Sequence, residues 1–270
     1  MNNNQPIGIF DSGVGGLTVV KEIIDLLPNE KIIYLGDTAR VPYGNKSPES
    51  IKRFSIENVE FLMKHKVKLI VVACNTASST SLPVLRKRFD IPIVEVIKPG
   101  AKRAVALTIN KRIGIIATST TIKSSAYKKE IKSLASAAKV YQAACPLFVP
   151  LSEEGWTNGK ITLDIAKKYL RNISKKNIDT LVLGCTHYPL LKDVISRAIG
   201  SDIKIVDSAS SVAHEVSTIL EKYDLRSTSH KEPSYKFFVT DEVKHFVRIG
   251  ERFLGRKIGN VRRVDVCTKS

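Results

Sequence analysis

The chain has 270 residues, of which 43% are hydrophobic and 26% are charged, as in a globular protein large enough for two domains. No apolar run reaches the roughly 18 residues that a membrane span requires, and the N-terminus MNNNQPIGIF lacks the basic and apolar segments of a secretory signal. The cysteines lack the paired spacing of a disulfide scaffold or a zinc module. We therefore expect a cytoplasmic protein with reduced thiols at Cys74, Cys145, Cys185 and Cys267.

The formal net charge is +17, and the lysines and arginines that produce it are spread along the whole chain. Such a charge attracts anionic small molecules and favours loose contact with nucleic acid. The aromatic content is only 7%, and no signature of an RNA- or DNA-binding module is present. We interpret the charge as a solvated surface, and nucleic-acid contact stays an alternative that no motif supports.

In chain order, short apolar runs rich in β-branched residues predict strands that begin at residues 7, 32, 69 and 91, with helical patterns between them. A second set of such runs begins at residues 113, 139, 180 and 203. Corresponding strands of the two sets are 106 to 112 residues apart. A nearly constant offset is typical of two copies of one unit. The sequence therefore predicts an α/β fold of two similar, doubly wound, mostly parallel domains, with the active site in the cleft between them.

The segment after the second set of strands exceeds the repeat. Its pattern predicts a helix from Ser210 to about Tyr223, a strand at YKFFVT and a helix from about Glu242. A turn at Lys98-Pro99-Gly100 marks the expected crossing between the halves. We expect the C-terminal segment to return to the first domain, which then comprises residues 1–97 and 209–270, with residues 98–208 as the second domain.

The expected strand order brings particular loops together. In a flavodoxin-like sheet the first and third strands are neighbours, and ligands bind beyond the carboxyl ends of the strands. The loop with Asp11 and Ser12 is then expected beside Cys74, and the run Thr118–Thr121 beside Cys185. If the two halves face each other, all four loops surround one crevice.

Cys74 and Cys185 occupy the same position in the two halves, at the end of an uninterrupted apolar strand and before a helix. A thiol beside a helix N-terminus can have a lowered pKa, which makes it a candidate for proton transfer. The matched pair predicts one proton-transfer group on each face of a substrate. The competing interpretation, a small residue of the core, is kept for Cys145 and Cys267.

Two further side chains are candidate partners of these thiols. His187 follows Cys185 by two residues and can favour its thiolate or carry its proton. Asp11 is the corresponding candidate near Cys74, although Asp11 and Glu153 are also consistent with simple helix caps. A zinc site built from Cys74, Cys185 and His187 lacks the usual spacing of ligand pairs.

The segment GIFDSGVGGLT follows a strand and begins a helix, which is the setting of a dinucleotide-binding loop. Gly13 and Gly15 match the first two glycines of that motif, and Asp37 has the spacing of a ribose ligand. Thr18, however, stands where the third glycine is required. We therefore interpret the glycines as allowing a tight turn that aims helix N–H groups at an anion.

Five motifs occur together in this order: DSGVGGLT, DTARVPYG, ACNTAS, PLFVPLSEEGW and GCTHYPLL. From about Ile7 to about Glu215, the chain resembles the bacterial glutamate racemases of the cofactor-independent aspartate/glutamate racemase superfamily. The resemblance implies two α/β domains around a cleft, interconversion of L- and D-glutamate, and supply of D-glutamate for peptidoglycan. It also implies a homodimer that needs no cofactor or metal and does not bind a membrane.

The resemblance assigns roles to individual residues. It carries the acid/base roles onto Cys74 and Cys185, with Cys74 acting on D-glutamate and Cys185 on L-glutamate. It gives supporting roles to Asp11, Glu153 and His187. Together with the hydroxyls expected beside Cys185, the predicted substrate contacts are Asp11, Ser12, Tyr43, Gly44, Asn75, Thr76, Thr118, Thr121, Thr186 and His187.

Three alternatives stay open on the sequence. A related racemase would act on aspartate or a hydantoin. A cysteine hydrolase would use one thiol with His187 and form a covalent acyl intermediate. A nucleic-acid-binding module would show salt-sensitive binding that survives the loss of both strand-end cysteines.

Overall fold

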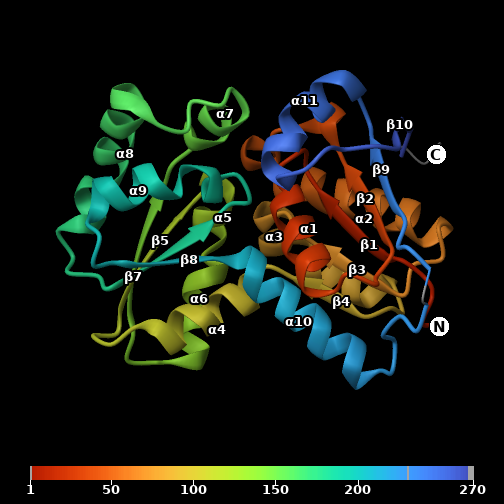
Figure 1. Cartoon of the computed structure of the whole chain (residues 1–270). Coiled ribbons are helices and arrows are strands. Elements are labelled where there is room, and N and C mark those ends of the chain that lie inside the picture. The colour runs from red at the N-terminus through yellow and green to blue at the C-terminus, as the bar shows by residue number, and fades with distance from the viewer. Residues whose placement is uncertain (1, 230, 267–270) are drawn as a thin grey trace.

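The computed structural model describes residues 2–229 and 231–266, which form two parallel β-sheets covered by helices (Figure 1). The first sheet has the order β10-β9-β2-β1-β3-β4, with β1 (Ile7–Asp11), β2 (Ile32–Gly36), β3 (Leu69–Val72), β4 (Ile93–Glu95), β9 (Tyr235–Val239) and β10 (Val261–Arg263). The second has the order β6-β5-β7-β8, with β5 (Arg112–Ala117), β6 (Lys139–Ala144), β7 (Thr180–Gly184) and β8 (Lys204–Asp207). Each sheet with its own helices is here called a lobe.

The helices cover both faces of each sheet. The first lobe carries α1 (Leu17–Leu26), α2 (Pro48–Lys64), α3 (Asn75–Arg88) and α11 (Val243–Leu254). The second carries α5 (Ser119–Ser124), α6 (Ala126–Leu134), α7 (Phe148–Glu153), α8 (Gly159–Ser174) and α9 (Lys192–Ile199), while α4 (Ile97–Leu107) and α10 (Ser208–Lys222) join the lobes. Short 3₁₀ turns are η1 (Thr38–Arg40), η2 (Tyr43–Asn45) and η3 (Tyr188–Leu191).

The central strands β1, β2, β3 and β7 are buried along their whole length. A parallel sheet with helices on both faces has no solvated side, so its strands read as continuous apolar runs rather than as alternating ones. This pattern made the strands recognisable in the sequence. The predicted α/β class with two doubly wound sheets is confirmed, as is the pairing of β1 with β3 and of β5 with β7.

Most predicted strands and helices lie close to the observed ones, but the turn predicted at Lys98-Pro99-Gly100 is wrong. These residues form the first turn of α4, where a proline is tolerated because its missing N–H has no partner within the helix. The strand expected at residue 91 begins at Ile93, because Pro92 has no N–H to donate to a neighbouring strand. The helix expected from Ser210 begins at Ser208, and YKFFVT and the helix after Glu242 are β9 and α11. Two elements, β10 and α7, were not predicted.

The two lobes share one cluster of buried apolar side chains. It connects Ile9 of β1 and Val20 of α1 to Ile115 of β5, and it includes Val212 and Val216 of α10. Each such side chain contributes about 1.5–3 kcal/mol on burial. The pairing of the lobes is therefore part of the core rather than a loose contact across a linker.

The C-terminal segment lies on the first lobe. The strand β9 pairs in parallel with β2, β10 pairs with β9, and α11 packs against α1. We propose that residues 1–97 with 209–270 and residues 98–208 are the two domains of the chain.

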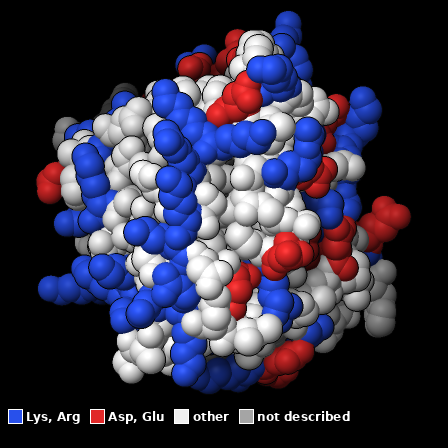
Figure 2. Space-filling model, turned by 90° about the vertical axis from the view of Figure 1, so that its left-hand side faces the viewer, with Lys and Arg blue, Asp and Glu red and all other residues white. Residues whose placement is uncertain are grey.

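The surface is basic over a wide area. Figure 2, which views the second-lobe side, shows Lys and Arg side chains spread across the face, with most of the visible acidic side chains toward its right. A field of this sign favours the approach of small anions. Within residues 2–229 and 231–266, no helix has both the length and the apolar character needed to cross a membrane.

Candidate active site

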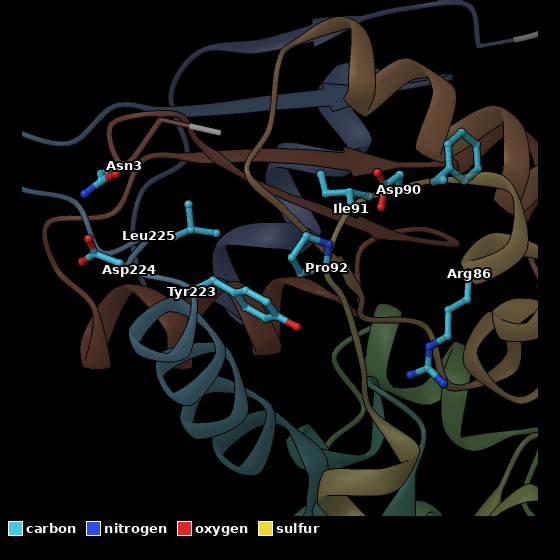
Figure 3. A pocket seen from close by; sticks show the side chains of 9 residues that line it. Asn3, Arg86, Asp90, Ile91, Pro92, Tyr223, Asp224 and Leu225 are labelled. Carbon is cyan, nitrogen blue, oxygen red and sulfur yellow. The ribbon is translucent and has the colours of Figure 1, made fainter.

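Two hollows at opposite ends of the first sheet differ in what surrounds them. The one at the amino end of β4 has a volume of about 720 Å³, and its polar groups are scattered (Figure 3). Asn3 and Asp224 lie on one side of it and Arg86 on the other. The second hollow, a cavity of about 390 Å³ at the carboxyl ends of the strands, is lined by both Cys74 and Cys185. Ligands of open α/β sheets bind at this end.

Cys74 comes from the first lobe, at the point where β3 ends and α3 begins. Its Sγ accepts a hydrogen bond from Ala77 N at 3.5 Å and lies 3.6 Å from Ser12 Oγ. Burial and the nearby negative charge of Asp11 raise the pKa of the Cys74 thiol from 9.0 to about 12, although the hydrogen bonds oppose this. Cys74 is therefore a protonated thiol at neutral pH.

Asp11 lies behind the cavity wall and is fully buried at the end of β1. Its Oδ2 accepts a hydrogen bond from Gly13 N at 2.9 Å, and Thr186 Oγ1 of the other lobe donates to its Oδ1 at 3.5 Å. Burial raises the pKa of Asp11, while the positive charge of His187 and the backbone donors counteract this. The carboxyl group thus interacts electrostatically with Cys74 of its own lobe and with His187 of the other.

Cys185 comes from the second lobe, directly after β7, and has a histidine partner. Its Sγ lies 3.8 Å from His187 Nδ1, and His187 Nε2 lies 3.0 Å from Glu153 Oε1. Burial lowers the pKa of His187, but its hydrogen bonds and charge interactions with Cys185 and Glu153 outweigh this and raise it to about 10. The imidazolium in turn lowers the pKa of Glu153 against the opposing effect of burial.

Side chains from both lobes supply hydrogen-bonding groups to the cavity. The hydroxyls of Thr76, Thr118 and Thr121 form a cluster with oxygen separations of 3.0–3.3 Å. Asn75 Oδ1 accepts a hydrogen bond from Tyr127 OH at 2.7 Å, whereas the buried Asn75 Nδ2 has no partner among residues 2–229 and 231–266. A buried donor without a partner is costly, so Asn75 offers a free N–H to a ligand that enters the cavity.

A loop of the first lobe forms another wall. Tyr43 OH donates to Asp37 and accepts from Asn58 Nδ2 at 3.1 Å, which fixes the ring. The carbonyl of Gly44 accepts a hydrogen bond from Thr120 Oγ1 at 2.7 Å, so the loop is tied to the second lobe. Asp37 is also held by Arg40 at 2.7 Å, and it does not line the cavity as a ribose ligand would.

The glycine-rich loop approaches the other lobe closely. A Cβ at Gly15 would lie 2.5 Å from His187 Nδ1 and would also collide with Thr186 Oγ1. Thr18 Oγ1 donates to Gly15 O at 2.9 Å and contacts Thr186 O at 3.3 Å. The motif therefore accommodates the partner lobe, and Thr18 at the third glycine position makes an interlobe contact.

The structure brings most of the predicted residues to the cavity wall. Asp11 and Thr121 are the exceptions, because both are buried one layer behind it. The wall residues that match the prediction are Ser12, Tyr43, Gly44, Cys74, Asn75, Thr76, Thr118, Glu153, Cys185, Thr186 and His187.

Sequence reasoning missed part of the apolar wall. The missed wall residues are Val41, Pro42, Asn45, Pro146, Leu147, Val149 and Pro150, whereas Ser119 lies within the predicted run Thr118–Thr121. Most of them lie inside the motifs DTARVPYG and PLFVPLSEEGW, so the position of these motifs was the available signal. Of the remaining cysteines, Cys145 is buried in the core, and Cys267 lies outside the described residues.

No group of three His, Cys, Asp or Glu side chains within the described part of the chain has the arrangement of a metal site. Cys74, Cys185 and His187 line the same cavity, and Cys185 Sγ lies 3.8 Å from His187 Nδ1, but the three do not form such a group. The cavity is lined by the buried thiol of Cys74 from the first lobe and by the sulfur of Cys185, next to the His187 imidazolium, from the second. This arrangement can remove and deliver protons.

Residues 7–216 match the family model described as Asp/Glu/Hydantoin racemase. The chain belongs to this family. The glutamate racemase of Geobacter metallireducens is 52% identical over 97% of both chains. The crystal structure of the Francisella tularensis glutamate racemase in complex with D-glutamate has a TM-score of 0.93 at 40% identity, and that of the Bacillus anthracis isoform RacE1 has 0.94 at 42%, each covering 98% of both chains.

More distant solved structures are similar to this chain in fold. An aspartate racemase homologue from Pyrococcus horikoshii has a TM-score of 0.59 at 18% identity, covering 80% of this chain and 99% of its own. The two-lobe architecture around the cavity is thus common to proteins with different names. The residues at the cavity, rather than the fold, must carry an argument about the substrate.

Proposed function

We propose that the chain is a glutamate racemase that interconverts L- and D-glutamate by moving the α-proton between two cysteines. The observation that carries the proposal is the single cavity lined by Cys74 from one lobe and Cys185 from the other. The glutamate racemases at 40–52% identity, one of them solved with D-glutamate, support glutamate as the substrate.

Inversion at a carbon atom explains why two thiols are needed. The α-proton leaves from one face of the substrate, and a new proton arrives on the other face. A single base would have to cross the substrate, whereas two fixed groups act from opposite sides. We propose that Cys185 removes the proton of L-glutamate while Cys74 delivers its proton, and that the roles exchange for D-glutamate.

The charges around the sulfurs suit these starting roles. Cys74, with a pKa of about 12, carries a proton that it can give to the carbanion. Cys185 lies 3.8 Å from His187, whose pKa of about 10 leaves it positively charged at neutral pH. A cation beside the sulfur stabilises a thiolate, the form that acts as a base. Asp11, Glu153 and His187 are thus supporting groups in the proposal.

The substrate carbanion needs donors that are already in place. We propose that the free Asn75 Nδ2, the hydroxyls of Thr76 and Thr118, and Thr186 bind the substrate carboxylates. The helix α3 begins directly after Cys74, and the backbone N–H groups at its N-terminus favour a negatively charged group nearby. Donors that are fixed before the reaction stabilise developing charge without having to reorganise.

Racemisation in deuterated water tests the proposal directly. Purified protein incubated with L-glutamate is expected to yield D-glutamate that carries deuterium at the α-carbon, as measured by chiral chromatography with mass detection. A panel with aspartate and hydantoins in place of glutamate tests the related racemase activities. Turnover of one of those compounds, with none of glutamate, would overturn the substrate assignment.

The cellular setting follows from the same proposal. We propose that the enzyme works as a homodimer in the cytoplasm and supplies D-glutamate for peptidoglycan synthesis. Mass measured by light scattering at micromolar concentration is expected to be that of two chains. Depletion in a bacterium that lacks another source of D-glutamate is expected to cause lysis that added D-glutamate relieves.

A further inference from the structure

The helix α11 of the first lobe contacts the histidine of the second lobe. The ring of Phe253 lies edge-on to His187, with 5.3 Å between ring centroids and 77° between ring planes. Phe253 is only 2% exposed. The family match ends at residue 216, so this contact comes from a part of the chain beyond the matched segment. Figure 1 shows α11 at the top of the first lobe, on the side toward α7.

The buried face of α11 that carries Phe253 is anchored within the first lobe. Phe246 packs on Tyr34 with 6.1 Å between ring centroids, and Ile249 and Leu254 belong to the shared core. Gly250 lies so close to Leu17 of α1 that a Cβ there would come within 2.8 Å of it. The helix therefore cannot shift without moving the first lobe as well.

Two other residues of α11 act on the same part of the second lobe. The guanidinium of Arg252 occupies the space that a Cβ of Gly155 would need, two residues after Glu153. An electrostatic interaction with His245 contributes to the lowered pKa of Glu153, after the larger effects of burial and of His187. His245, Arg252 and Phe253 are spaced by seven and eight residues, so they share one face of the helix.

We propose that Phe253 is a positioning residue that holds His187 between Cys185 and Glu153, so that α11 makes proton transfer at Cys185 depend on the correct seating of the two lobes. This inference rests on the racemase function proposed above. The imidazole is held at its two nitrogens by Cys185 and Glu153 within its own lobe. Phe253 of the other lobe makes a T-shaped contact with the imidazole ring, and an aromatic pair of this geometry is favourable.

Several charged groups surround His187, and a displaced ring would change its distance to each of them. Cys185 and Glu153 lie on the second lobe, and buried Asp11 acts from the first. His245 and Arg252 of α11 face Glu153 and Gly155. A change at Phe253 therefore alters both the geometry and the protonation of the histidine.

Kinetic isotope effects separate the two thiols. L- and D-glutamate have equal free energies, so kcat/KM is the same in both directions for every variant. The isotope effect on kcat/KM can differ between the two directions. In the proposed mechanism α-deuterated L-glutamate is deprotonated at Cys185 and α-deuterated D-glutamate at Cys74. Slower transfer at Cys185 raises the first isotope effect and lowers the second.

The test compares Phe253→Leu with Phe253→Tyr and with Phe246→Leu. Phe246 is a matched control, since it lies on the same helix and is also 2% exposed, but it packs on Tyr34. For Phe253→Leu we expect kcat/KM to fall on the order of tenfold, with the L-isotope effect raised, the D-isotope effect lowered and the pH profile displaced. Phe253→Tyr, which keeps the ring, is expected to restore the wild-type isotope effects.

Other outcomes would overturn the inference. If Phe253→Leu and Phe246→Leu lose activity alike with unchanged isotope effects, Phe253 is only a core residue. The same holds if Phe253→Leu has the wild-type rate. Failure of the proposed function itself would be visible separately, because the wild-type protein would then show no turnover of either glutamate enantiomer.

Discussion

The two half-sites share a backbone position and differ in their electrostatics. Cys74 and Cys185 each follow the strand next to the first strand of their sheet. Cys74 has a carboxyl group and a hydroxyl nearby, whereas Cys185 has an imidazolium backed by a carboxylate. The repeated fold thus determines where the sulfurs lie, and the unlike neighbours determine that one starts protonated and the other beside a cation.

The largest effect is expected from removing either sulfur. Cys74→Ala and Cys185→Ala should each lower the racemisation rate by at least about a thousandfold, because each leaves one face of the substrate without a proton donor or acceptor. Circular dichroism of the substrate follows the rate. Cys145→Ala is the matched control, a buried cysteine outside the cavity, and should stay close to wild type. Near-normal racemisation by either single-thiol variant would remove the two-base mechanism.

Substitution of the supporting residues should affect proton transfer at one thiol more than at the other. His187→Asn and Asp11→Asn are each expected to reduce kcat/KM about a hundredfold. The isotope effects should move in opposite senses. His187→Asn makes transfer at Cys185 slower, and Asp11→Asn makes transfer at Cys74 slower. If both variants change the isotope effects in the same sense, the assignment of His187 to Cys185 and of Asp11 to Cys74 is wrong.

The contact between the lobes can be perturbed at one glycine. In Gly15→Ala the added methyl group would collide with Thr186 and His187, so the loops must move apart. We expect a loss of about 1–3 kcal/mol in the free energy of unfolding and roughly a tenfold fall in kcat/KM. Gly259→Ala is the control, since no atom of the residues that the structure describes lies within 4 Å of its added methyl group. Equal effects of the two substitutions would contradict the role of this contact.

A smaller change is expected from Glu153→Gln, because the Glu153 side chain is 31% exposed and water screens its charge. Loss of the carboxylate should let the pKa of His187 fall from about 10 toward its usual 6.5. The alkaline limb of the profile of kcat/KM against pH should therefore move to lower pH, with a loss of only a few-fold at neutral pH. An unmoved limb would mean that the limb belongs to another group.

The smallest effect concerns stability. The pKa of His187 is about 10 in the folded chain, above the ordinary 6.5, so its protonation stabilises the fold. This contribution is complete below pH 6.5 and is lost as the pH rises through 10. Urea unfolding of wild type and His187→Asn should show a difference in free energy that shrinks across this interval. A constant difference would refute the pKa assignment.

The main strands and their order could be predicted because burial on both faces leaves uninterrupted apolar runs. The strand β10 could not, since Val261–Arg263 is short, largely exposed and basic. The site followed from the same logic: strand ends gave Cys74 and Cys185. The apolar wall at Pro146–Pro150 and the position of Asp11 behind the surface depend on side-chain packing, which no periodicity reports.

The interlobe contacts were the least predictable part of the molecule. Phe253 and His187 are separated by 66 residues in the chain, and their contact requires the relative placement of two sheets. The motif GVGGLT gave a partial signal, because glycines indicate close backbone approach. Only the structure identified the neighbour of Gly15 as the loop after Cys185.

The side-chain N–H group of Asn75 that has no hydrogen-bond partner has a consequence for inhibitor chemistry. A buried N–H that lacks an acceptor costs about 1–3 kcal/mol, and Asn75 Nδ2 has no acceptor among the described residues. A compound that places an oxygen against Asn75 Nδ2 recovers that energy on binding. An analogue of the same shape with a methyl group there would leave Asn75 Nδ2 without a hydrogen bond, and should bind with roughly one order of magnitude or more lower affinity.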